Sequence, residues 1–335
     1  MPQPTILLTG ASGTIGRHAA VALAAAGFHV RGLTRSARKA RALSQAGRPE
    51  LNWPDFEWVE GDMESPSDIQ RALAGSEAAI YLHHAVGESR DYTAREARSA
   101  RLFQLAADEA GVRRIVYLGG IVPLEHESAH LESRRVTGEI LRTATATTIE
   151  LRATMVIGCN SASFSIIRDL AVQLPVLALP AWLDNYSCPV AICDVAAAIA
   201  LAAILPQPCS SWFDLPGPQR LTHRDLIEHL TVPLGTRVLD RRIARISPRL
   251  AAFGVSIVSR VSPSLSRELI LGLNGDLTPN GPVFWDRLGQ PTLRALTHAI
   301  VDALADESVS IRPSPETRRR IARKTLEWLE RIERG

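Results

Sequence analysis

The sequence predicts an α/β fold built on a doubly wound parallel sheet. Two observations support this prediction. Apolar, strand-like runs alternate with helix-like segments through the first half of the chain, and a glycine-rich turn joins the first run to the first helix. With 335 residues, 46% of them hydrophobic, the chain is long enough for one large domain or a core with a smaller cap. A net charge of +3 gives no reason to expect nucleic acid as a partner.

Six strand-like segments follow one another through the first 155 residues or so. The expected strands are 4–8, 29–34, 56–60, 78–82, 114–118 and 148–152. The expected helices between them are 17–26, 37–45, 66–74, 91–110 and 131–144. Ser65-Pro66 is a good start signal for the third helix, and Gly111 ends the fourth. Strands separated by helices of this length favour parallel pairing with right-handed crossovers.

Residues 9–16, with the sequence TGASGTIG, connect the first strand to the first helix. A strand, a glycine turn and a helix in this order are what a dinucleotide pyrophosphate needs, because the glycines let the backbone turn sharply and approach the phosphates. The helix N-terminus then offers free N–H groups and a positive dipole end. The alternative is an ordinary glycine-rich turn. The residues expected to bind the nucleotide here are Gly10, Ser12, Gly13, Thr14, Ile15 and Gly16.

The end of the second strand predicts which nucleotide binds. Sites that prefer NAD usually place Asp or Glu there, where the carboxylate accepts from the ribose 2′-hydroxyl. In this chain Arg35 stands in that place, and Arg38 follows. A guanidinium can hold a 2′-phosphate through two N–H bonds, so we expect NADP(H) in preference to NAD(H). The alternative is a solvated basic start of the next helix.

Two further strand ends contribute candidate cofactor contacts. After the third strand, Asp62 could accept from the adenine amino group, and Met63 could pack on the adenine ring. After the fourth strand, His83 and His84 are expected beside the pyrophosphate and ribose. Adjacent side chains in an extended loop diverge, and the sequence places no third ligand near them, so we expect no metal site.

These motifs resemble the atypical short-chain dehydrogenase/reductases, in particular the NmrA-like group. The segments that carry the resemblance, which covers about residues 4 to 230, are 9–16, 61–62, 116–120, 151–152, 156–158, 161–164 and 189–195. The resemblance implies a Rossmann-type domain that binds NAD(P)(H), with the substrate in a cleft beside a small C-terminal region. We therefore expect an NAD(P)-binding domain over 1–155, with its core continuing to about 215, a mainly helical substrate-side region over 156–310, and an amphipathic helix over 311–335.

The chain departs from this family where the chemistry takes place. Catalytic members have Ser or Thr at the end of strand five and a Tyr-x-x-x-Lys on the next helix, in which the Tyr gives the proton and the Lys holds the nicotinamide ribose. Here the strand ends in Gly119-Gly120 without a hydroxyl, and His130 and Arg134 occupy the Tyr and Lys positions. Arg134 could still bind ribose hydroxyls, and His130 could be a general acid. The alternative is that His130 only begins a helix.

Three function classes stay open at this point. A reductase without the Tyr suits a substrate that delocalises the charge it receives, such as a quinone, enone or iminium ion. The missing residues equally favour a non-catalytic NAD(P)H-binding sensor or accessory protein, and a redox-neutral isomerase or epimerase is the third class. We expect Gly119 beside the cofactor. The residues expected to contact substrate are Gly120, Ile121, Arg152, Thr154, Trp182 and Tyr186.

The remaining expectations concern location and partners. Four cysteines lack metal-type spacing, the apolar N-terminal run has no basic leader, and the most apolar stretch, 190–205, is too short to span a bilayer. We therefore expect a cytoplasmic protein with reduced thiols, no membrane span and a small-molecule substrate. The sequence is also compatible with a homo-oligomer.

Overall fold

The computed structural model describes nine stretches of the chain. They are residues 3–46, 57–85, 91–123, 128–173, 176–179, 181–234, 239–242, 263–273 and 275–306. The amphipathic helix expected over 311–335 lies outside the described residues.

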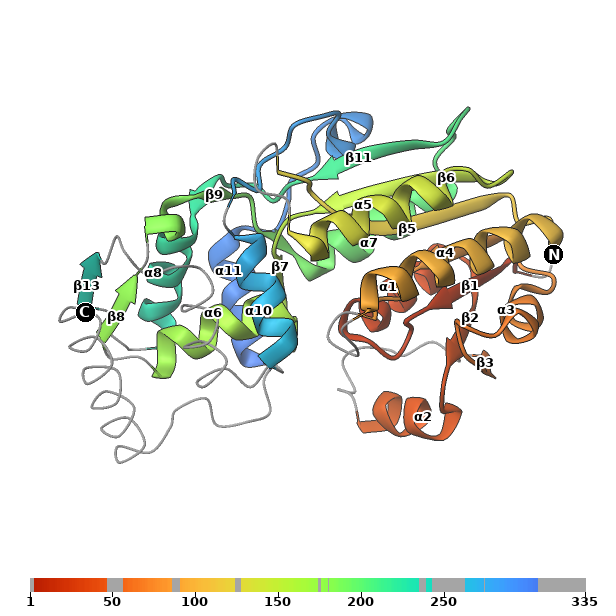
Figure 1. The fold of residues 1–335 in the computed structure, drawn as a ribbon, viewed down its shortest axis with the longest axis horizontal. Coiled ribbons are helices and arrows are strands. Elements are labelled where there is room, and N and C mark those ends of the chain that lie inside the picture. Colours follow the sequence, from red (N-terminus) through yellow and green to blue (C-terminus); the bar gives the residue numbers. More distant parts are fainter. Residues whose placement is uncertain are drawn as a thin grey trace.

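A seven-stranded parallel sheet organises the larger part of the molecule (Figure 1). Its strands are β1 (Thr5–Thr9), β2 (His29–Thr34), β3 (Glu57–Glu60), β4 (Ala78–Tyr81), β5 (Arg114–Gly120), β6 (Thr147–Ala153) and β11 (Ser211–Leu215). They lie in the order β11-β6-β5-β4-β1-β2-β3. The doubly wound parallel sheet predicted from the sequence is confirmed, although the edge strand β11 was not predicted. Because the chain order reverses between β1 and β4, the crevice for a nucleotide opens at the carboxyl ends of these two strands.

Helices cover both faces of the sheet. Those over one face are α1 (Thr14–Ala25) and α7 (Ile192–Ile204), and those over the other are α3 (Pro66–Leu73), α4 (Tyr92–Glu109) and α5 (Ala129–Leu141). The alternation of side chains along β1 explains this arrangement, because Ile6 and Leu8 pack with the first group of helices and Leu7 packs with the second. The short helix α2 (Ala37–Ala46) follows β2.

The start of α5 places two candidate residues. The Ser128 hydroxyl accepts a hydrogen bond from the Leu131 N–H at 3.3 Å and caps the helix. The helix therefore begins at Ala129, two residues before the expected start, and His130 lies in its first turn. Arg134 follows one turn later on the same side.

A second, mainly helical region follows β6. Its helices are α6 (Ala162–Gln173), α8 (His223–Leu234), α10 (Pro263–Gly272) and α11 (Leu296–Ala305), with short 3-10 turns η1 (Ala181–Asp184) and η2 (Phe284–Leu288). Three small strand pairs accompany them: β7 (Val156–Ile157) with β10 (Val190–Ala191), β9 (Tyr186–Ser187) with β12 (Leu221–Thr222), and β8 (Val176–Leu179) with β13 (Leu239–Arg242). These helices pack around their own core, which includes Phe164, Leu230 and Ile300.

Within the described part of the chain, no helix combines the length and the apolar character needed to cross a membrane.

Candidate nucleotide and substrate site

The turn between β1 and α1 forms a cradle that side chains would fill. Gly10 has a φ of +66°, a conformation that L side chains rarely adopt, and a Cβ on it would lie 2.8 Å from the Leu82 carbonyl oxygen. A Cβ on Gly16 would overlap the carbonyl oxygen of Gly10. The Gly13 N–H donates to that same carbonyl at 2.9 Å and closes the turn. At Gly10 and Gly16, two of the glycines expected in the nucleotide turn, the structure therefore has no room for a side chain.

The surroundings of this cradle suit a pyrophosphate. The first turn of α1 contains no acidic residue, so nothing there competes for the positive end of the helix dipole. Thr9 ties the end of β4 to the turn, because its hydroxyl donates to the Ile80 carbonyl at 3.3 Å and accepts from the Leu82 N–H at 2.9 Å. This tie brings the segment with His83 and His84 beside the turn.

A cavity of about 510 Å³ opens from the glycine turn toward the helical region. The ends of β4, β5 and β6 and the start of α5 form one side of it, and α6 and α10 contribute the rest. The sequence-predicted residues that line it are Gly10, Gly13, Thr14, Ile15, Gly16, His84, Gly119, Gly120, Ile121, His130, Arg134 and Thr154. A volume of this size is ordinary for a small-molecule site. The structure thus brings the cofactor turn and the candidate catalytic residues to one cavity.

The contact between Arg134 and His130 determines which nitrogen of the imidazole carries the proton. The Arg134 Nε–H donates to His130 Nε2 at 3.2 Å, and an arginine has only donors to offer. Nε2 must therefore be the unprotonated nitrogen, and the neutral ring carries its hydrogen on Nδ1. His130 is only 6% exposed, and its Nδ1 has no hydrogen-bond partner among the described residues. The His130 side chain thus contributes to the cavity wall, and its buried N–H has no acceptor among the described residues.

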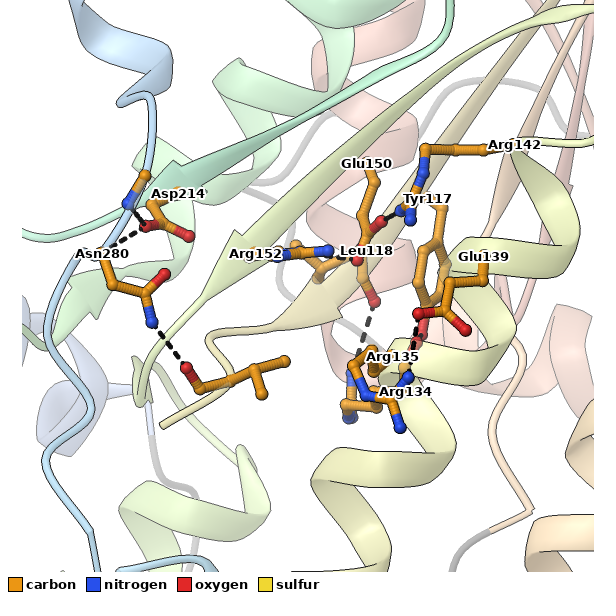
Figure 2. Close-up of polar contacts among 12 residues, drawn as sticks. Tyr117, Leu118, Arg134, Arg135, Glu139, Arg142, Glu150, Arg152, Asp214 and Asn280 are labelled. Carbon is orange, nitrogen blue, oxygen red and sulfur yellow. Dashed lines mark hydrogen bonds and ion pairs between the residues drawn. The ribbon is translucent and has the colours of Figure 1, made fainter. Parts of the chain in front are cut away.

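Arg134 is itself held at the end of β5. A second nitrogen of its guanidinium, Nη1, donates to the Leu118 carbonyl oxygen at 3.3 Å. Figure 2 shows this bond as a dashed line between Leu118 and Arg134. The Tyr117 hydroxyl donates to the main-chain carbonyl of Arg134 at 3.0 Å and fixes this turn of α5 against the sheet. The guanidinium is therefore oriented from both the strand and the helix.

Both histidines of the cavity stay neutral. Burial, followed by the positive charge of Arg134, holds the pKa of His130 well below its usual value. The same two causes lower the pKa of His84 to about 4. At neutral pH neither ring carries a charge, so the sequence-based role of His130 as a charged general acid loses its physical basis.

Glu96 on α4 is a site residue that sequence reasoning missed. Its carboxylate, in a residue 2% exposed, accepts from the Ala85 N–H at 2.8 Å and from the Ser133 hydroxyl, and it lies 3.8 Å from His84 Nδ1. Burial acts to raise the pKa of Glu96, but hydrogen bonding and charge from His84, Ser133 and Arg134 lower it to about 2. A glutamate within an amphipathic helix looks like a solvated side chain, so no sequence pattern singled it out.

Several residues that line the cavity were also missed. They are mostly apolar side chains of the helical region, namely Met155, Ile166, Ile167, Leu265, Leu269, Ile270, Leu273 and Leu277. Asn160, in the left-handed region with a φ of +61°, accepts from the Thr14 hydroxyl at 3.2 Å. This bond joins the glycine turn to the start of α6, across a separation of 146 residues that no local pattern reveals.

Several expected cofactor residues lie outside the cavity. Arg35 and Arg38 are exposed at the end of β2 and the start of α2, where a 2′-phosphate would be held. Met63 is buried with Leu33 and Ile69 in the core beneath α3. Asp62 accepts from the Glu64 N–H at 2.9 Å. The other two expected residues that do not line the cavity are Ser12 and His83.

The expected substrate contacts at Arg152 and Tyr186 are engaged elsewhere. Arg152 donates to Glu150 at 2.9 Å and lies over the Trp212 ring, 3.9 Å from its centroid. Figure 2 shows Glu150 between Arg142 and Arg152, with Arg152 on the side toward Asp214. Tyr186 is 37% exposed and stacks against Arg220. Trp182 belongs to η1, and its side chain lies outside what the structure describes.

Comparison with known proteins identifies the first part of the chain. Residues 10–156 match the model of a family described as NAD(P)H-binding. These residues form an NAD(P)H-binding domain. The expected membership in an NAD(P)-binding family is thereby confirmed for this domain. A search of curated proteins gives no match.

Solved structures resemble the chain over most of its length. A triphenylmethane reductase from Citrobacter sp., complexed with NADP(H), has a TM-score of 0.67 at 19% identity, covering 89% of this chain and 99% of that chain. A quinone oxidoreductase from Escherichia coli, complexed with NADPH, has a TM-score of 0.67 at 19% identity and covers 88% and 98%. A nucleoside-diphosphate-sugar epimerase from Staphylococcus aureus has a TM-score of 0.68 at 15% identity and covers 89% and 99%. At these identities the likeness establishes the fold alone.

Proposed function

We propose that the protein is an NADP(H)-dependent reductase that transfers hydride to a small conjugated electrophile such as a quinone, an enone or an iminium ion. The observation that carries this proposal is one cavity that joins the nucleotide cradle to the Arg134–His130 pair, in which the His130 N–H has no acceptor among the described residues. Two structurally similar proteins are NADPH-linked reductases, which supports the same class of reaction.

The residues of the cradle fit the cofactor. The turn of Gly10, Gly13 and Gly16 would hold the pyrophosphate at the N-terminus of α1, and Arg35 with Arg38 would hold the 2′-phosphate. The bound nicotinamide supplies the hydride. The chain's own contribution is to orient the ring, exclude water with the apolar side chains of α6 and α10, and stabilise the charge that develops on the substrate.

His130 has the features of a neutral hydrogen-bond donor that keeps its proton during the reaction. A neutral imidazole holds its remaining proton far too tightly to release it at neutral pH, yet its N–H can donate a hydrogen bond to an oxygen that becomes negative. Neutral histidines are known to polarise carbonyl groups in this way. Such a site suits a conjugated acceptor, because the reduced product spreads its charge and can take a proton later from water. A simple ketone, whose alkoxide needs a proton at once, is a poor substrate.

The proposal is tested by the oxidation of NADPH with a panel of quinones and enones, followed through the absorbance of the reduced ring. We expect turnover, and we expect His130→Phe to lower kcat by about 100-fold, since it removes one donor to the developing oxyanion. His130→Gln restores an N–H donor and should recover part of the rate. Because the imidazole stays neutral, kcat should be flat between pH 6 and pH 8, a range set by the usual histidine pKa.

Two outcomes would contradict this function and favour one of the other two function classes. Saturable nucleotide binding without oxidation of NADPH across the whole panel would favour the non-catalytic sensor or accessory protein. Interconversion of a substrate with its epimer, with no net change in nucleotide, would favour the redox-neutral class, to which one structurally similar protein belongs by name. A kcat that falls as the pH rises through 6 to 7 would contradict the neutral role of His130.

A further inference from the structure

The described wall of the cavity is positively charged. Among the described residues that line it, Arg134 is the one charged side chain, and neither aspartate nor glutamate is present. His84 and His130 add two neutral imidazoles beside the guanidinium. The rest of the described lining is main chain, small hydroxyl and amide groups, and apolar side chains such as Leu265 and Leu269 on α10.

The carboxylate of Glu96 is close to the cavity but is kept out of it. Glu96 does not line the cavity, and its oxygens are occupied by the Ala85 N–H and the Ser133 hydroxyl. The His84 ring, 22% exposed, both lines the cavity and contacts Glu96 Oε1 through Nδ1. The imidazole therefore stands between the carboxylate and the cavity and keeps the carboxylate out of contact with a bound molecule.

From this arrangement we infer that the substrate is a neutral conjugated carbonyl compound and that the site discriminates against cationic electrophiles. The inference rests on the proposed reductase function and narrows its substrates to quinones and enones, because an iminium ion is a cation. A guanidinium in a partly buried site repels a cation, because charge–charge interactions there are several times stronger than in water. The His130 N–H also needs an acceptor, and a carbonyl oxygen provides one, whereas an iminium nitrogen or a triphenylmethane cation offers none.

The arrangement also shows which side chain sets the preference. If His84 is the barrier between Glu96 and the cavity, its removal should expose a carboxylate to the ligand. His84→Ala should then bind cations better than the wild-type protein does. The double variant His84→Ala/Glu96→Gln makes the same space without the charge, so it is the matched control.

The experiment compares a naphthoquinone with the same ring carrying a trimethylammonium group. Equilibrium binding is measured by tryptophan fluorescence with NADP⁺ present, so that no turnover is needed, and kcat/KM is measured separately with NADPH. We expect the wild-type protein to bind the neutral probe about ten-fold more tightly than the cation. His84→Ala should shift this ratio by about ten-fold toward the cation, and the double variant should return it close to the wild-type value.

The outcomes separate the two proposals. Equal or tighter binding of the cationic probe by the wild-type protein overturns the inference, and NADPH oxidation by that probe would leave the reductase function standing. A preference for the neutral probe without NADPH oxidation supports the inference about the pocket and contradicts the reductase. An unchanged ratio in a folded His84→Ala variant, checked by circular dichroism, contradicts the role of His84 as the barrier. If neither probe binds, the inference is overturned.

Discussion

The glycine turn and the start of α5 face the same cavity, but they are built in opposite ways. The turn works through main chain and through the absence of side chains, as the φ of Gly10 and the close packing at Gly16 show. The start of α5 depends on particular side-chain atoms. The hydrogen bond from Arg134 sets which nitrogen of His130 carries the proton, and the His84 ring lies between Glu96 and the cavity. The first region fixes which ligand the protein holds, and the second fixes what can happen to it.

The two regions also differ in their tolerance to substitution. A cradle made of main chain loses its shape when a Cβ is added to one of its glycines, because the position of a Cβ is fixed by the backbone and no rotamer avoids the clash. A side-chain site can lose its function while the fold remains, because neighbouring groups still pack. Substitutions in the two regions test this contrast.

The largest effect should come from adding atoms to the cradle. In Gly16→Val the new side chain overlaps the Gly10 carbonyl, so we expect loss of NADP(H) binding together with a fall of about 3 kcal/mol in the free energy of unfolding. In Gly13→Ala the Cβ would lie 3.1 Å from the same oxygen at an exposed position, so binding should be lost with little change in stability. Calorimetric titration and thermal unfolding measure the two quantities. Nucleotide binding by Gly16→Val at wild-type affinity would refute the cradle.

This contrast explains what the sequence could predict. The turn is a local pattern, because strand, glycines and helix follow one another within residues 5–25, and the structure has them as expected. The seven-stranded sheet was accessible for the same reason, except for β11. By contrast, Glu96 meets Ala85, His84 and Ser133 from separate elements, and no spacing rule connects them. The identity of the proton-bearing nitrogen in His130 depends on a distance, which a sequence does not contain.

A buried histidine in the helical region should make the stability of the protein depend on pH. Burial lowers the pKa of His223, which is fully buried in α8, to about 4. Between pH 6.5 and pH 4 the unfolded chain therefore binds more protons at this residue than the folded chain does, and stability must fall as the pH falls. From pH 7.5 to pH 5 we expect His223 to lower the free energy of unfolding by about 2 kcal/mol. Urea unfolding at both pH values measures this loss.

The matched variant for this prediction is His223→Leu, which has no titrating group. Its stability should fall by about 2 kcal/mol less than that of the wild-type protein over the same pH interval. His84 and His130, whose pKa values are also lowered by burial, contribute in the same direction and remain in both proteins. Parallel pH profiles for the variant and the wild-type protein would show that the His223 ring is not buried in its neutral form.

A smaller effect on nucleotide affinity is expected at the 2′-phosphate end of the cofactor. If Arg35 holds the 2′-phosphate, Arg35→Ala should weaken NADPH binding about ten-fold, the value of one charge-assisted hydrogen bond, and leave NADH binding nearly unchanged. Titration of the variant and the wild-type protein with both nucleotides measures this difference. Wild-type protein that binds NADH as tightly as NADPH would remove the proposed preference altogether. An equal loss for both nucleotides would assign Arg35 to a contact that does not distinguish them.

The smallest effect should arise where the glycine turn meets the helical region. The Thr14 hydroxyl donates to the Asn160 carbonyl and is one direct bond between the glycine turn and the helical region. Thr14→Val keeps the shape of the side chain and removes the donor, so nucleotide affinity should fall by about three-fold, while Thr14→Ser should bind as the wild-type protein does. The bond links the glycine turn to the start of α6, which lines the cavity, so its loss should also raise KM for the substrate. A change confined to nucleotide affinity would mean that the turn and the start of α6 are positioned independently of each other.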